Sequence, residues 1–232
     1  MAAPERAASA GKREPHIRES FDQALLSLEQ DVLRMGRMAG DLIHRAVEAF
    51  TRRDAAMADS VVVEDDLVDA LHFEVEQRVV QLLATQQPMA GDLRWLASVM
   101  AISIDLERLA DHAEAIARAA RRLDAPLLRP QVDIPHMEQA VQEMLSSVLQ
   151  AFTARDAALA ASVGPKDDTV DALRSQIFRE LISYMIEDPR TVSRALELLI
   201  VAQHLERAAD HITNVAERVI YIVTGELKEI ND

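Results

Sequence analysis

The sequence predicts an all-α protein that consists of two tandem, homologous three-helix bundles with six long helices in total. The composition favours helices, because the 232 residues include only six glycines, eight prolines and 3% aromatic residues, while 49% are hydrophobic and can form a core. Apolar residues recur in steps of three or four over long segments, which is typical of amphipathic helices. An internal repeat then divides these helices into two similar halves.

The repeat is visible in two segments of similar sequence. One reads AFTRRDAAMADSVVVEDDLVDAL from Ala49, and the other reads AFTARDAALAASVGPKDDTVDAL from Ala151, an offset of 102 (151 − 49). Further along, Glu107 corresponds to Glu206, an offset of 99 (206 − 107). We therefore predict a disordered tail at 1–15, a first bundle at 16–125, a linker at 126–134 and a second bundle at 135–232.

The first bundle is predicted to contain helices at 16–53, 56–86 and 90–123. In the first of these, apolar residues recur every three or four positions from Leu25 to Ala46. Pro88 ends the second helix, because proline has no backbone N–H and its ring disturbs the preceding turn.

The second bundle is predicted to contain helices at 135–155, 157–186 and 190–227. Pro189 separates the last two, and the linker segment DAPLLRPQVDIP contains three prolines. Helices of this length joined by short turns pack in alternating directions and bury one stripe each. We expect Trp95 to belong to the core.

Charge and cysteine content exclude several functional classes. The formal charge of −14 and the lack of a basic stripe argue against nucleic-acid binding. Without cysteine, there is neither a disulfide nor a thiolate metal ligand. The sequence has neither a signal-peptide pattern nor a long apolar run, so we expect a cytoplasmic protein.

Pairs of carboxylates recur at the edge of the predicted core. Asp65 and Asp69 are four residues apart in the second helix, as are Glu107 and Asp111 in the third, so each pair shares one helix face. The second bundle repeats these pairs at Asp167, Asp171, Glu206 and Asp210. Two such pairs can meet at one end of a bundle, where they suit a cation such as Mg, Ca, Mn, Fe or Zn. Alternatively, neighbouring arginines such as Arg108 and Arg207 form salt bridges with them.

Histidines follow the aspartates directly in both bundles. His112 and His211 lie about 100° around the helix from Asp111 and Asp210, so we expect them to support metal ligands by hydrogen bonds or to lie at the surface. His204 and Asn214 are further candidates for this supporting role.

These motifs resemble the PhoU family of accessory regulators of phosphate uptake. The matching segments are DDLVDAL, QPMAGDLRWL and DLERLADHAEAIA in the first half, and DDTVDAL and HLERAADHITNVAE in the second. The resemblance implies two similar three-helix bundles, and it implies multinuclear iron or zinc clusters in some members, with no organic cofactor. Carried over by position, the candidate ligands are Asp65, Asp69, Glu107, Asp111, Asp167, Asp171, Glu206 and Asp210.

The resemblance also implies a function. Family members are adaptors between the ATPase subunit of the phosphate ABC transporter and a sensor histidine kinase, and they restrain uptake and the phosphate-starvation response. We therefore expect a cytoplasmic homodimer that has no enzymatic activity and meets the membrane only through its partners. The alternatives are a carboxylate-bridged di-metal oxidase and a plain helical spacer. The oxidase is disfavoured because the repeated sites lack the Glu-x-x-His spacing that such enzymes use.

The two halves differ within the family signature. Where the second half has Asn214 and Glu217, the first half has Ala115 and Arg118. At the position of Asp105 in the first half, the second half has His204. The more complete signature indicates that the second half binds metal more strongly than the first.

Overall fold

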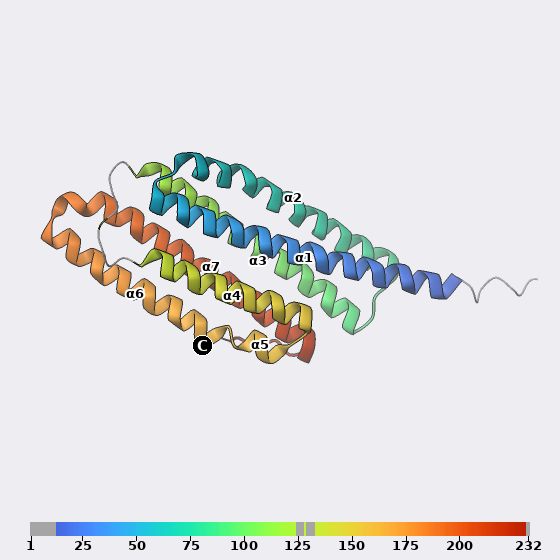
Figure 1. Cartoon of the computed structure of the whole chain (residues 1–232). Coiled ribbons are helices and arrows are strands. Elements are labelled where there is room, and N and C mark those ends of the chain that lie inside the picture. The colour runs from blue at the N-terminus through green and yellow to red at the C-terminus, as the bar shows by residue number, and fades with distance from the viewer. Residues whose placement is uncertain (1–12, 124–127, 129–132, 231–232) are drawn as a thin grey trace, which may run out of the picture.

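The computed structural model describes residues 13–123, 128 and 133–230, and within these ranges the chain is helical without strands (Figure 1). The α-helices are α1 (Arg13–Arg52), α2 (Ala55–Gln86), α3 (Gly91–Arg122), α4 (Ile134–Ala154), α5 (Ala157–Ala161), α6 (Gly164–Glu187) and α7 (Val192–Thr224), with a 3-10 turn η1 (Pro189–Thr191). The all-helical prediction is confirmed. Because α1 begins at Arg13, the end of the predicted tail is helical. The rest of that tail and most of the linker lie outside the described residues.

The first repeat forms three continuous helices whose ends follow local sequence signals. The Asp54 carboxylate accepts a hydrogen bond of 3.0 Å from the backbone N–H of Met57 and so caps the start of α2. At the other end, Gln87 adopts a left-handed conformation with φ 47°, and Pro88 follows. The observed boundaries lie within three residues of the predicted ones.

The second repeat departs from the prediction of one helix at 157–186. The chain breaks between α5 and α6, because Pro165 in the first turn of α6 has no N–H to continue the α5 hydrogen-bond ladder. Repeat 1 has Val63 at the corresponding position (165 − 102), and α2 continues through it. The last helix is also shorter than predicted, since α7 ends at Thr224 before Gly225, whose φ is +80°.

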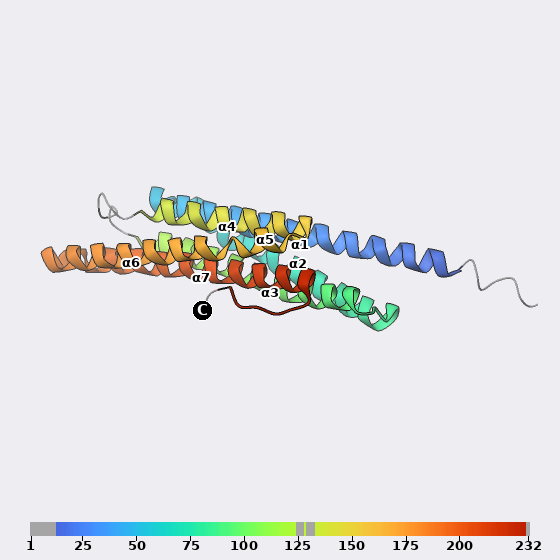
Figure 2. The ribbon, with the colours of Figure 1, turned by 90° about the horizontal axis from the view of Figure 1, so that it is seen from below.

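The helices form two layers (Figures 1 and 2). Helices α1 and α4 lie side by side in one layer, and α2, α3, α7 and α6 follow one another in the second, with α3 and α7 in long contact between the repeats. We call the side of this second layer that faces away from α1 and α4 the open face, since none of the described helices covers it. Residues 226–230 run back along α7 on this side, where the Ile230 N–H donates a hydrogen bond of 3.0 Å to Glu217. Among the described residues, no helix is both long and apolar enough to cross a membrane.

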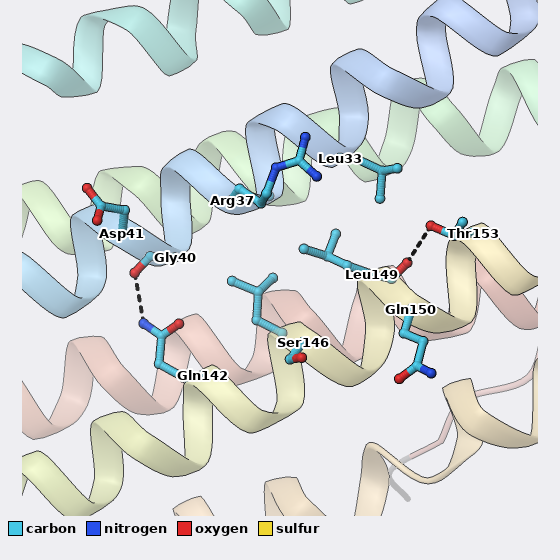
Figure 3. A pocket seen from close by; sticks show the side chains of 11 residues that line it. Leu33, Arg37, Gly40, Asp41, Gln142, Ser146, Leu149, Gln150 and Thr153 are labelled. Carbon is cyan, nitrogen blue, oxygen red and sulfur yellow. Dashed lines mark hydrogen bonds between the residues drawn. The ribbon is translucent and has the colours of Figure 1, made fainter.

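The repeats approach closely where α1 crosses α4. A Cβ atom added to Gly36 would lie 2.6 Å from Cδ2 of Leu149, and one added to Gly40 would lie 2.8 Å from Cδ2 of Leu145. The side chain of Gln142 donates a hydrogen bond of 2.8 Å to the Gly40 carbonyl, beside a groove of about 440 Å³ (Figure 3). Two glycines four residues apart on α1 therefore allow this close packing.

Trp95 joins the two repeats within the core, as its expected packing role requires. Its side chain is 5% exposed and stacks on Phe152 of α4, with ring centroids 6.4 Å apart. The guanidinium of Arg155 lies over the same indole ring, 5.3 Å from its centroid, and also pairs with Glu29 of α1 at 3.2 Å.

Candidate metal centre

Three carboxylates of repeat 1 converge on the open face. Asp65 and Asp69 come from adjacent turns of α2, and Asp111 comes from α3. One oxygen atom from each lies within 4.8 Å of the others. The four-residue spacing places both α2 carboxylates on the side that faces α3, so the predicted meeting of the two helices is present in this repeat.

The two α2 carboxylates of this group have buried oxygen atoms that form no hydrogen bond with the described residues. These atoms are Oδ1 of Asp65 and Oδ1 of Asp69, which lack a hydrogen-bond partner within the part of the chain that the structure describes. Burial, together with the neighbouring charges of Asp69 and Asp111, raises the pKa of Asp65 to about 7. Burial and the charge of Asp111 also raise the pKa of Asp69. A hard cation fits this arrangement, because it would supply partners for the buried oxygens and remove the repulsion between them.

Glu107 lies beside this group of three carboxylates. Burial and the charge of Asp111 raise the pKa of Glu107, so its carboxylate shares the same electrostatic environment. Arg108 contacts Glu107 at 3.4 Å and Asp111 at 2.9 Å, which is part of the salt-bridge alternative. The Arg108 side chain is 55% exposed, however, and an exposed pair of this kind contributes little stability.

Two further residues of repeat 1 belong to the same environment, although sequence reasoning did not select them. The charge of Glu114 contributes to the raised pKa values of Asp65 and Asp69, and Glu114 pairs with Arg118 at 2.5 Å. His72 acts against the rise in the pKa values of Asp69 and Glu107, because its charge lowers them. Its Nδ1 lies 3.2 Å from the Ser103 hydroxyl. Glu114 and His72 each lie three residues after a predicted ligand, and this spacing could have indicated them.

The carboxylates of repeat 2 are arranged differently. Asp167 is 4% exposed, whereas Asp171 and Asp210 are exposed residues and Glu206 is half-buried. Glu206 has Arg174 at 3.8 Å, and burial raises its pKa. The pKa of Asp210 is also raised, by partial desolvation of its carboxyl group and by the charge of Asp171, although the residue as a whole is exposed. Within the described residues, the carboxylate group of three or more that could hold a metal ion is the one in repeat 1. The geometry thus favours repeat 1, the reverse of what the more complete signature indicated.

The local helix geometry accounts for part of this difference. Asp65 lies inside the continuous helix α2, whereas Asp167 lies in the first turn of α6, directly after the break that Pro165 imposes. Repeat 2 also has Thr213 in place of Glu114 (213 − 99), so it lacks one neighbouring negative charge. The same motif therefore occupies different positions along its helix in the two repeats.

The histidines form a polar contact between α3 and α7. The Nδ1 atoms of His112 and His204 lie 3.2 Å apart. The Asp105 carboxylate lies 3.0 Å from Nδ1 of His211 and accepts a hydrogen bond of 3.2 Å from the side chain of Asn214. These bonds join the two repeats: His112 contacts His204, while His211 and Asn214 both contact Asp105.

Burial disfavours the charged forms of His112 and His204. Burial and the neighbouring His204 and His211 lower the pKa of His112 to about 4, and burial with the charge of Arg207 lowers the pKa of His204. Both imidazoles are therefore neutral at physiological pH. Asp105 is the residue that sequence reasoning missed here, because its role depends on the pairing of α3 with α7.

Comparison with known proteins relates both repeats to one family. The model of the PhoU domain matches residues 32–120 and 134–219. The phosphate-specific transport system accessory protein PhoU homolog of Clostridium acetobutylicum is 39% identical over 217 residues, which cover 93% of this chain and 99% of that relative.

Solved structures show the same architecture. The crystal structure of PhoU from Pseudomonas aeruginosa superposes with a TM-score of 0.85 at 38% identity, covering 89% of this chain and 100% of that one. The phosphate transport system regulatory protein PhoU from Streptococcus pneumoniae gives a TM-score of 0.84 at 32% identity, covering 90% of this chain and 99% of that one. The predicted fold and the predicted resemblance are confirmed.

Proposed function

The chain belongs to the PhoU family, and on this premise we propose that it is a negative regulator of phosphate uptake and of phosphate-starvation signalling. In this proposal it is an adaptor between the ATPase subunit of the phosphate ABC transporter and a sensor histidine kinase. Support comes from two relatives, one named as a transport accessory protein and the other as a transport regulatory protein, which this chain matches over most of its length. It would act in the cytoplasm, as a homodimer and without enzymatic activity.

The observation that best supports a regulatory binding role is the acidic cluster of repeat 1 on the open face. It gathers three carboxylates, and the buried Oδ1 atoms of Asp65 and Asp69 have no hydrogen-bond partner among the described residues. None of the described helices lies over the cluster, so ions and proteins can approach it. No observation favours the di-metal oxidase, since the histidines beside the aspartates bridge α3 and α7.

We further propose that the cluster binds metal, with iron or zinc as the preferred ions and Mg, Mn or Ca as alternatives. Asp65, Asp69 and Asp111 would hold the ion, with Glu107 as a neighbouring ligand. The cation would neutralise the carboxylates and fix α2 against α3. The carboxylates of repeat 2 remain weaker candidates, because they do not converge in the same way.

The function can be tested in cells and with purified proteins. Deletion of the gene should leave a phosphate-starvation reporter active in high phosphate, and the intact gene should restore repression. The purified chain should also bind the ATPase subunit and the cytoplasmic part of the kinase. Normal repression in the deletion strain, together with no binding to either protein, would contradict the proposal.

A further inference from the structure

Large apolar side chains are exposed beside the acidic residues of repeat 2. Phe178 (47% exposed) and Ile182 (37%) lie seven and eleven residues after Asp171, so they extend the same side of α6. Leu196 on α7 is 49% exposed and lies fourteen residues before Asp210, on the same side of its helix. We call these residues the repeat 2 patch; its other members are Ile186 and Val192.

Repeat 1 has a matching arrangement. Phe73 (58% exposed) and Val80 (53%) lie four and eleven residues after Asp69 on α2. Ile104 is 45% exposed and lies seven residues before Asp111 on α3. We call Phe73, Val80 and Ile104 the repeat 1 patch. In both repeats the apolar residues lie on the same side of their helices as the acidic residues, nearer the turn that joins the two helices (α2 to α3, or α6 to α7). They therefore belong to the open face.

A pseudo-twofold axis between α3 and α7 relates the two patches. Adding the repeat offset of 99 converts His112 into His211 and Asp105 into His204. The His112–His204 contact therefore corresponds to the His211–Asp105 contact when the repeats are exchanged. Because these contacts lie between the two acidic regions, the open face has an acidic centre with one apolar patch on each side.

The charge of this centre determines which occupant fits. Its eight predicted ligand carboxylates outnumber the arginines beside them, which are Arg108, Arg174 and Arg207. One divalent cation at the repeat 1 cluster would still leave this centre with a net negative charge. A second copy of the chain would place two such centres opposite each other, where like charges repel. A basic surface is complementary.

We propose that the open face docks a two-fold-symmetric homodimeric protein partner, whose basic centre faces the carboxylates and whose two apolar contacts cover the two patches. This inference rests on the proposed adaptor function and adds the surface and the symmetry of the partner. The partner's two identical subunits would each meet one repeat. Exposed aromatic residues such as Phe73 and Phe178 are suitable anchors for such an interface.

The test uses three double variants of the full chain. Phe178→Ser with Ile182→Ser changes the repeat 2 patch, and Phe73→Ser with Val80→Ser changes the repeat 1 patch. The matched control is Val63→Ser with Leu67→Ser, because these α2 residues are 67% and 57% exposed but do not continue the line of Asp65 and Asp69. Circular dichroism checks that all three remain folded, as expected for exposed positions.

Affinity for the purified ATPase subunit and for the kinase fragment is then measured by calorimetry, and stoichiometry by native mass spectrometry. We expect each patch variant to bind about 10-fold more weakly than the unmodified chain, as loss of an anchor at an interface predicts. The control should bind like the unmodified chain. The complex should contain one copy of this chain for each partner dimer.

The possible failures are distinguishable. If the unmodified chain binds neither protein, the proposed function fails and the docking inference fails with it. If it binds but the patch variants bind equally well, or the control loses as much affinity, the function stands and this surface is wrong. A loss in only one patch variant overturns the two-fold arrangement. Self-association that both patch variants abolish assigns the face to a second copy and overturns the partner assignment.

Discussion

The two repeats carry the same acidic motif, yet only repeat 1 gathers it into a cluster of three carboxylates among the described residues. Asp65 and Asp69 lie within an unbroken α2, whereas Asp167 lies one turn from a helix start that a proline imposes. Repeat 2 retains the fuller family signature on its third helix. The comparison teaches that the motif supplies the ligand atoms. Whether those atoms converge depends on whether the helix that carries the motif is continuous, as α2 is, or interrupted, as between α5 and α6.

The largest expected effect comes from imposing the repeat 2 break on repeat 1. Val63→Pro should destabilise the protein by about 3 kcal/mol, because α2 is continuous at this position and proline removes a hydrogen bond and clashes with the preceding turn. Urea denaturation measures this cost. The corresponding control, Pro165→Ala, should change stability by less than about 1 kcal/mol, since Pro165 already begins a helix. Equal costs at both positions would contradict the account of the break.

The metal site gives the next effect. Asp65→Asn with Asp69→Asn should weaken binding of Mn²⁺ or Zn²⁺ about 100-fold, because it removes two converging carboxylates. Isothermal titration calorimetry of chelator-treated protein measures the affinity. The matched change in repeat 2, Asp167→Asn with Asp171→Asn, should have a much smaller effect. A larger loss from repeat 2 would restore the order that the family signature suggested.

The unpartnered charge of Asp65 makes a prediction for the metal-free protein. Its pKa is about 7 in the folded chain and about 3.9 in an unfolded chain, so ionisation destabilises the fold increasingly as pH rises from about 4 to above 7. Asp65→Asn should therefore stabilise the chelated protein by about 1–2 kcal/mol at pH 8 and by less at pH 5. Thermal unfolding at both pH values measures the gain. Asp66→Asn, at an exposed neighbouring position, should show no such gain.

The smallest effect distinguishes the two symmetry-related contacts between α3 and α7. Asp105→Ala should cost about 1 kcal/mol, because His211 and Asn214 lose their common partner. His204→Ala should cost less, since it removes a contact between two neutral imidazoles. Chemical denaturation of both variants gives the comparison, and a greater cost at His204 would contradict it.

Local sequence signals predicted most of the fold. Apolar periodicity and Pro88 predicted the helix ends of repeat 1 to within three residues, and Pro189 marked the boundary between α6 and α7. The internal repeat predicted two matching bundles. The break before α6 was missed, although Gly164 and Pro165 were visible, because the alignment with repeat 1 suggested one continuous helix. The pairing of Asp65 with Asp111 could be anticipated from antiparallel packing. The role of Asp105 could not, because it depends on how one repeat packs against the other.

The contacts between α3 and α7 show what joining two similar units in one chain permits. In a dimer of identical subunits, every contact near the symmetry axis must occur twice with the same residues. Here one copy of the contact is His112 with His204, and its counterpart is His211 with Asp105. Because the two repeats belong to one chain, corresponding positions need not carry the same residue. The two related contacts between α3 and α7 can therefore differ in their side chains while the helices keep the same arrangement.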